Sequence, residues 1–97
     1  MTVNKIQNGS SCTLSVKGRL DTVTAPALEA EIAKITDADS LVIDFKELEY
    51  ISSAGLRVLL ATHKNFVKKG GLTITNPNET VNDVFEVTGF NDILVIK

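Results

Sequence analysis

The order of the predicted elements indicates an α/β fold built on a mixed, mostly parallel β-sheet. Strand-like and helix-like segments follow one another as β-β-α-β-α-β-α-β, which gives about five strands and three helices. The alternation after the first two strands predicts right-handed crossovers and parallel pairing, while the first two strands pair as a hairpin. With 97 residues, 43% of them apolar, the chain has the size of one domain spanning residues 1–97.

The first third of the chain is predicted to form the hairpin and one helix. Residues 2–7 and the alternating residues 12–16 have strand-like composition and flank an Asn-Gly-Ser turn. The period then changes, because Leu28, Ile32 and Ile35 fall at i, i+4 and i+7. A Thr-Ala-Pro start signal precedes these residues, so the first amphipathic helix begins there.

The middle of the chain reads as a central strand followed by a second helix. Residues 41–45 form a short, β-branched apolar run that suits a strand covered on both faces. From Ser53 to Lys69 the spacing is helical, and Gly70 and Gly71 end the helix. One stripe of this helix is apolar and carries Leu56, Leu59, Leu60, His63, Phe66 and Val67. Residues 50–55 therefore form a strand-to-helix junction, where binding sites gather in open parallel sheets.

The last third repeats the strand-helix-strand order. Residues 72–75 read as the fourth strand, and an Asn-Pro-Asn turn leads into the third helix. That helix carries Val81, Val84, Phe85 and Thr88 on one face, and Gly89 is its expected end. Residues 93–96 supply the fifth strand.

Charge and apolar patterning argue against several classes of function. Ten basic and twelve acidic residues give a formal net charge of -2, which argues against a nucleic-acid ligand held by phosphate attraction. The longest apolar runs are far shorter than the roughly 20 residues of a membrane-spanning helix, so no membrane partner is expected. The N-terminus carries no export signal, and the single Cys12 cannot form an intramolecular disulfide. We therefore expect a cytoplasmic protein.

Ser53 lies between a strand and a helix, where the nucleophile of a hydrolase can lie. The nucleophile elbow requires glycine two residues before and two residues after the serine, but Ile51 occupies the first position and only Gly55 matches. The sole histidine, His63, is ten residues further along the same helix, about 15 Å away at 1.5 Å rise per residue. With no other histidine and no second cysteine to build a triad or zinc site, we expect no enzyme, cofactor or metal.

The polar residues around this junction also have purely structural interpretations. Ser52 or Ser53 can cap the helix, because a serine hydroxyl accepts a hydrogen bond from a first-turn N–H. Asp21 suits a turn, His63 suits a packed, hydrogen-bonded and half-buried position, and Arg57 suits a solvated helix face. These interpretations stay open on the residues alone.

Residues 48–60, Leu-Glu-Tyr-Ile-Ser-Ser-Ala-Gly-Leu-Arg-Val-Leu-Leu, resemble the signature of the STAS family, specifically of the bacterial anti-anti-sigma factors. The family motif is of the type Asp-Ser-Ser/Thr/Ala-Gly-Leu, and its first serine is the phosphorylation site. The matching residue here is Ser53. Similarity extends over nearly the whole chain, at residues 18–21, 24–25, 41–45 and 87–90. The resemblance implies a STAS-like fold and the function of an anti-sigma factor antagonist.

Two features depart from the family pattern. Ser52 stands where the family has an acidic residue before the phosphorylated serine, which makes Ser52 a second candidate acceptor. The sequence also ends after the predicted fifth strand, whereas family members usually continue into a C-terminal helix. We therefore expect one face of the sheet to be less covered, or to be covered by a partner.

The resemblance implies a partner-switching cycle in a bacterial cytoplasm. The unphosphorylated protein binds an anti-sigma factor, itself an ATP-dependent serine kinase, and thereby frees a sigma factor for transcription. The kinase inactivates its antagonist by phosphorylating Ser53, and a PP2C-type phosphatase restores it. ATP and metal belong to these partners. The alternative is a STAS scaffold or interaction module that is never phosphorylated and docks in a larger signalling or transport complex.

The residues expected to contact the partner surround Ser53. They are Asp21, Ser52, Ala54, Gly55, Arg57, Val58 and Ala61. Asp21 is included among them because it matches a family position near the phosphorylation site. The face that carries Arg57, Val58 and Ala61 points away from the core stripe of the second helix, so we expect it to be exposed; a solvated face without a partner is the alternative.

Overall fold

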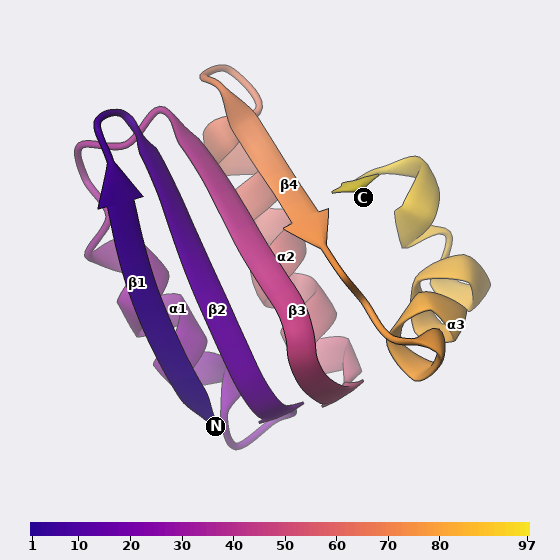
Figure 1. Ribbon diagram of the computed structural model, residues 1–97. Coiled ribbons are helices and arrows are strands. Elements are labelled where there is room, and N and C mark those ends of the chain that lie inside the picture. The colour runs from indigo at the N-terminus through magenta and orange to yellow at the C-terminus, as the bar shows by residue number, and fades with distance from the viewer.

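The computed structural model describes residues 1–97 and contains one five-stranded sheet with strand order β1-β2-β3-β4-β5 (Figure 1). The elements are β1 (Thr2–Asn8), β2 (Ser11–Leu20), α1 (Ala25–Ala33), β3 (Ser40–Ile51), α2 (Ser53–Phe66), β4 (Gly71–Thr75), α3 (Glu79–Thr88), the short 3₁₀ helix η1 (Phe90–Asp92) and β5 (Val95–Ile96). Only the β1–β2 pair is antiparallel, and the other three pairs are parallel. The predicted order of elements and the mixed, mostly parallel sheet are therefore confirmed.

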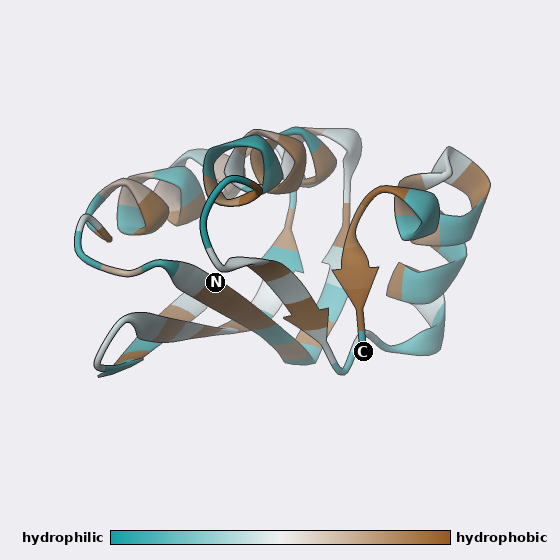
Figure 2. Cartoon of the chain, turned by 90° about the horizontal axis from the view of Figure 1, so that it is seen from above, coloured by the Kyte–Doolittle hydropathy of each residue, from teal (hydrophilic) through white to brown (hydrophobic).

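The sheet has one face covered by helices and one open face. Helices α1 and α2 lie over the same face, and α3 lies beside the β4 end of the sheet (Figures 1 and 2). Alternate residues of β2 and β3 point toward α1 and α2 and are at most 1% exposed; these are Cys12, Leu14, Val16, Leu41, Ile43 and Phe45. The residues between them, such as Thr13, Ser15 and Asp44, are only half-buried. The expectation that the central strand is covered on both faces is therefore wrong.

Strands β2 and β3 are longer than the sequence pattern indicates. The predicted segments, residues 12–16 and 41–45, are the regular parts of a 10-residue and a 12-residue strand. Beyond them the pairing shifts register, first between Ser15 and Lys17 and again between Gly18 and Arg19. Each shift adds one residue to β3, so its buried positions move from Phe45 to Leu48 and then to Ile51, which breaks the period-two alternation that marks a strand in a sequence. The two strands nevertheless continue side by side to Leu20 and Ile51.

The ends of α3 are set by its flanking residues. Asn78 caps the start, since its side-chain oxygen accepts a hydrogen bond of 2.8 Å from the backbone N–H of Val81. Gly89 ends the helix with φ of 78°, a left-handed conformation that glycine adopts without strain. The predicted stop is confirmed. The fifth strand is shorter than predicted because the N–H groups of Ile93 and Leu94 donate to the carbonyl oxygen of Phe90 in η1, and only Val95 and Ile96 pair with β4.

Helix α2 buries Leu56, Leu59 and Phe66, as its apolar stripe predicts. The stripe fails at Val67, which follows the end of the helix and is 56% exposed. The helix ends at Phe66 rather than Lys69, and a turn then leads into β4. Thr62 is also buried, and its hydroxyl is satisfied there because it donates to the carbonyl oxygen of Val58 at 2.7 Å.

Candidate functional site at the start of helix α2

A single residue joins the end of β3 to the start of α2. Ser52 is extended, with φ of -103° and ψ of 176°, and its backbone N–H donates to the carbonyl oxygen of Leu20 at 2.9 Å. Its own carbonyl oxygen accepts from the N–H of Leu56 at 3.0 Å and closes the first turn. These two bonds hold the helix start against the end of β2.

Gly55 allows the first turn of α2 to approach the two central strands. A Cβ at this position would lie 2.7 Å from Cγ of Leu20 and 2.8 Å from Cγ1 of Ile51, which is closer than carbon atoms pack. Gly55 is itself buried. Gly55 therefore supports the site through its packing against β2 and β3, and its contact with a partner stays a prediction.

The two adjacent serines differ in their access to solvent. Ser53 is the first residue of α2 and is exposed. Ser52 occupies the N-cap position, but its hydroxyl makes no capping hydrogen bond, and its Oγ is buried with no hydrogen-bond partner. The capping interpretation is therefore wrong for the Ser52 hydroxyl. Of the two hydroxyl-bearing side chains, that of Ser53 belongs to an exposed residue.

Asp21 follows directly after the Leu20 carbonyl that holds Ser52, and it organises the loop into α1. Its Oδ1 accepts from the backbone N–H groups of Val23 (3.0 Å) and Thr24 (3.1 Å). Hydrogen bonding by the Thr24 N–H is the main cause that lowers the pKa of Asp21; the Thr24 hydroxyl, the Val23 N–H and the Arg19 charge add to it. The turn interpretation of Asp21 is confirmed, and its carboxylate is already engaged within its own loop.

A groove runs between α1 and α2, next to Ser53. Its volume is about 480 Å³, and it is lined by Thr22, Ala25, Pro26, Glu29, Ala54, Arg57, Val58 and Ala61. A second hollow continues this groove along the same two helices, and the two share the lining residues Glu29, Val58 and Ala61. The other residues that line the second hollow are Ile32, Ala33, Thr62 and Asn65. We call the two together the α1–α2 groove. Arg57 is its only basic residue and Glu29 its only acidic one.

The predicted exposed face of α2 is correct for two of its three residues. Arg57 and Ala61 are exposed, and Ala54 is half-buried. Val58 is only 6% exposed and belongs to the hydrophobic core, so its assignment to an exposed face is wrong. The reason is that α2 packs against α1 as well as the sheet, and Val58 lies at that helix–helix contact, where it forms the floor of the groove.

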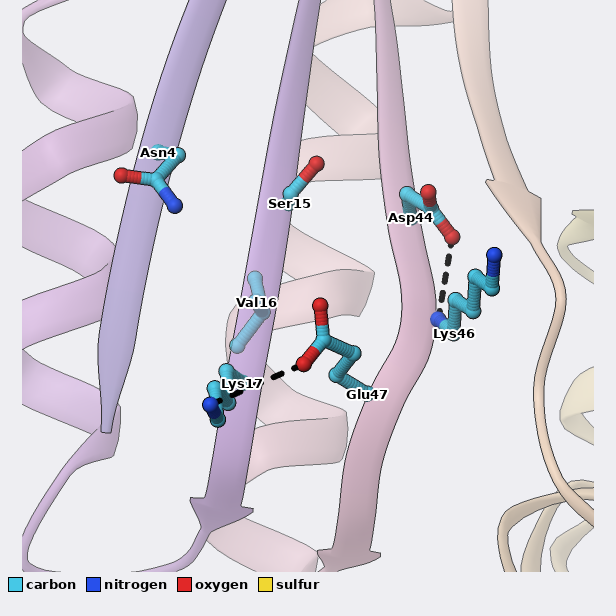
Figure 3. A pocket seen from close by; sticks show the side chains of 7 residues that line it. All are labelled: Asn4, Ser15, Val16, Lys17, Asp44, Lys46 and Glu47. Carbon is cyan, nitrogen blue, oxygen red and sulfur yellow. Dashed lines mark hydrogen bonds and ion pairs between the residues drawn. The ribbon is translucent and has the colours of Figure 1, made fainter.

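A smaller hollow on the open face of the sheet was not predicted. It has a volume of about 70 Å³ and is lined by Asn4, Ser15, Val16, Lys17, Asp44, Lys46 and Glu47 (Figure 3). Lys17 Nζ lies 3.7 Å from Glu47 Oε2, and the backbone N–H of Lys46 donates to Asp44 Oδ1 at 2.9 Å. The hollow combines residues of the β1–β2 hairpin with residues of β3 that lie about 25 residues or more further along the chain.

Three further features bear on metal binding, on the single histidine and on membrane insertion. No three His, Cys, Asp or Glu side chains gather as they would to bind a metal ion. His63 is half-buried, as expected, but its Nδ1 is buried with no hydrogen-bond partner. None of the helices is both long and apolar enough to cross a bilayer.

The mixed five-stranded sheet, with a serine at the start of the helix that follows its central strand, defines the class of this protein as a STAS domain. The family model for the STAS domain matches residues 2–97, and the chain belongs to this family. Over 93 residues it is 31% identical to the anti-sigma-B factor antagonist of Bacillus subtilis (strain 168), a match that covers 94% of this chain and 85% of that protein.

Solved structures agree with this assignment. An anti-sigma factor antagonist from Mycobacterium paratuberculosis superimposes with a TM-score of 0.89 at 29% identity, covering 98% of this chain and 83% of that one. The anti-sigma factor antagonist SpoIIAA in its unphosphorylated form superimposes with a TM-score of 0.84 at 18% identity, covering 99% and 88%. The second likeness shows the fold alone. The resemblance inferred from the sequence is therefore confirmed: this chain is a member of the anti-sigma factor antagonist branch of the family.

Proposed function

We propose that this protein is an anti-sigma factor antagonist. Its unphosphorylated form binds an anti-sigma factor that is also a serine kinase, and so releases a sigma factor. The observation that carries the proposal is Ser53, an exposed hydroxyl-bearing residue at the start of α2, beside the α1–α2 groove. The name borne by the Bacillus subtilis relative supports it.

The α1–α2 groove has the chemistry of a docking surface. Its walls carry mainly small side chains, among them Ala25, Ala54 and Ala61, which allow a partner backbone to approach closely. Arg57 and Glu29 add one charge of each sign, and neither takes part in an ion pair within the chain. Unpaired charges beside an apolar floor favour a partner that supplies complementary charges. Asp21 and Ser52 then act indirectly, by holding the loop and the helix start that border this surface.

Ser53 is the favoured acceptor of the phosphoryl group. A kinase must bring the acceptor hydroxyl in line with the γ-phosphate of ATP, so the acceptor must be accessible. Ser53 is exposed, whereas Oγ of Ser52 is buried. A phosphate adds about -1.5 to -2 charges at the edge of the groove. A partner surface shaped for a neutral hydroxyl would have to desolvate that charge, and binding would weaken.

Phosphorylation should leave the fold intact, so that the switch acts through the interface. The first N–H groups of a helix lack intrahelical partners, and the helix dipole favours negative charge there. A phosphate on Ser53 would therefore be compatible with α2. A PP2C-type phosphatase would return the protein to its binding form.

The test is the intact mass of the protein after incubation with ATP and the anti-sigma factor kinase of the same organism. We expect the mass of one phosphate, which Ser53→Ala abolishes and Ser52→Ala leaves unchanged. A phosphopeptide modified at Ser52 alone would contradict the assignment. Stable binding without any phosphorylation would favour the alternative, a constitutive STAS scaffold, for which the replacement of the family's acidic residue by Ser52 is the specific argument.

A further inference from the structure

Arg57 has no internal partner although it is the basic residue nearest in sequence to Ser53 on α2. The three ion pairs of the structure join Lys17 to Glu47, Arg19 to Asp21 and Lys34 to Glu31. The two cation–π contacts use Arg19 and Lys69. Arg57 takes part in none of them, makes no side-chain hydrogen bond and is exposed. Its guanidinium group is therefore free to bind an anion.

The spacing of Ser53 and Arg57 places them one helical turn apart. Residues at i and i+4 of a helix have Cβ atoms about 5 to 6 Å apart on the same face. Long helical side chains favour rotamers that lean toward the N-terminus, so a rotamer of Arg57 can bring its guanidinium group to Ser53. A negative group that precedes a positive group by four residues is also the favourable orientation of a helical ion pair.

We infer that Arg57 binds the phosphate of phosphorylated Ser53, an inference that rests on the proposed modification of Ser53. A guanidinium group fits phosphate oxygens with two parallel hydrogen bonds. Arg19, the other arginine of the chain, is already occupied, because it lies 4.0 Å from Asp21 Oδ2 and 4.6 Å from the centre of the Tyr50 ring. The capping position leaves room for the same anion, since the Ser52 hydroxyl makes no capping bond.

This pairing changes the α1–α2 groove as well as the modified residue. Arg57 is the only basic residue that lines the groove, and Glu29 is the only acidic one. When Arg57 turns toward the phosphate, the groove keeps Glu29 and loses its positive charge. Phosphorylation would therefore weaken the binding of a partner that contacts both Arg57 and Glu29 in two ways. It adds a negative group beside the groove, and it moves the Arg57 guanidinium group out of the groove.

The experiment installs phosphoserine at position 53 of the full chain by genetic encoding, so that no kinase is needed. Four proteins are compared: the otherwise unchanged chain, Arg57→Gln, Arg57→Lys and Lys64→Gln. The control at Lys64 removes the same charge from the same helix, eleven residues or about 16 Å from the phosphate. Phosphorus NMR measures the pH midpoint of the phosphate, and thermal melting compares each protein with its unmodified form.

We expect Arg57→Gln to raise the midpoint by roughly 0.3 pH units, because loss of the cation disfavours the dianion. The same variant should lose about 2 °C of the stabilisation that phosphorylation confers. Arg57→Lys should restore part of both effects, and Lys64→Gln should match the unchanged chain. Equal midpoints for Arg57→Gln and Lys64→Gln would overturn the inference. A kinase that fails to modify Ser53 would instead refute the proposed function, so the two failures are distinguishable.

Discussion

The two sides of the sheet present hollows of opposite character. On the helix-covered side, the α1–α2 groove has small apolar walls, and its two charged residues, Arg57 and Glu29, form no ion pair. On the open side, the hollow is polar and both of its carboxylates are engaged: Glu47 pairs with Lys17 at 3.7 Å, and Asp44 accepts hydrogen bonds from the Lys46 N–H and from Asn76. Apolar surface with unpaired charge remains available to a partner, whereas a polar hollow whose carboxylates are already engaged gains less by binding one.

The residues of the candidate site also fall into two sets: buried residues that pack the start of α2 in place, and exposed residues that a partner can contact. Gly55 is buried against β2 and β3 and Val58 is buried at the groove, while Ser53, Arg57 and Ala61 are exposed. Substitutions in the first set should change the stability of the fold, and those in the second set should change binding. Substitutions on the open side should do little of either.

The largest expected effect is that of Val58→Glu. Val58 is 6% exposed at the contact of α1 and α2, so a carboxylate there loses its hydration without gaining a partner. We expect a loss of about 3 kcal/mol in the free energy of unfolding, measured by urea denaturation. Ile6→Glu is the matched control, because Ile6 is a β-branched residue of the edge strand with 61% exposure. Equal losses of unfolding free energy in the two variants would contradict the inference that Val58, on the helix-covered side, is buried while Ile6, on the open side, is exposed.

The next effect is that of Gly55→Ala. The added methyl group would lie 2.7 Å from Leu20 Cγ and 2.8 Å from Ile51 Cγ1, so the start of α2 must shift away from the sheet. Overpacking of this kind costs about 1 to 3 kcal/mol, and a thermal melt should show it as a loss of about 4 °C or more. The control, Ala61→Ser, lies on the exposed part of the same helix and should stay within about 0.5 kcal/mol. An unchanged melting temperature for Gly55→Ala would show that the close contact is not needed.

A substitution in the exposed wall of the groove should affect binding rather than folding. Ala61→Trp fills the groove between α1 and α2 without disturbing a buried residue. We expect the affinity for the anti-sigma factor to fall about tenfold, equivalent to about 1.4 kcal/mol, with the melting temperature unchanged. Asn4→Trp is the control, since Asn4 is exposed and lines the open-face hollow. Equal affinities for the two variants by calorimetric titration would exclude the groove as the docking surface.

Asp21→Asn tests the hydrogen bonds that Asp21 makes within the loop before α1, a loop whose Thr22 lines the groove. The hydrogen bonds from Thr24 and Val23 lower the pKa of Asp21 in the folded state, so its charged form is the stabilising one. That stabilisation is present above the unfolded pKa and is lost as the pH falls through the lower, folded pKa. We therefore expect Asp21→Asn to melt lower than the unchanged protein at pH 7, with the difference shrinking in acid. Parallel melting curves across the acid range would contradict this role of the carboxylate.

Much of this architecture follows from periodicity, which a sequence displays directly. The apolar spacing of Leu28 and Ile32 predicts α1, although Ile35 lies beyond its end at Ala33, and Gly89 marks the end of α3. The extension of β3 was not predicted because each register shift adds a residue to β3 and breaks the alternation that identifies a strand. The extension of β2 was not predicted because Lys17, Gly18 and Arg19 interrupt its apolar pattern.

The candidate site was predictable as far as local chemistry specifies it. Ser53 stands out through its motif and its place at a junction, and both features are local. The burial of Val58 depends on α1, an element 25 or more residues earlier in the chain, and the periodicity of one helix does not report contacts with a second helix. The free Oγ of Ser52 depends on a side-chain orientation that the residue type leaves open. The burial of Val58 and the orientation of the Ser52 side chain therefore depend on tertiary packing, which the local sequence pattern does not determine.

The smallest expected effect is that of Lys17→Gln in the open-face hollow. Lys17 and Glu47 are joined at 3.7 Å, but their side chains are 69% and 65% exposed, so water and salt screen the attraction. An exposed pair of this kind contributes at most about 0.5 kcal/mol, because the ordering of two long side chains offsets most of the Coulomb gain. We expect urea denaturation in low salt to detect a small loss at most, and 1 M salt to remove it. Anti-sigma factor binding should stay unchanged, since Lys17 lies on the face opposite the groove. If Lys17→Gln instead weakened that binding as strongly as Ala61→Trp, the open face would be part of the interface, and the paired charges of its hollow would have to separate on binding.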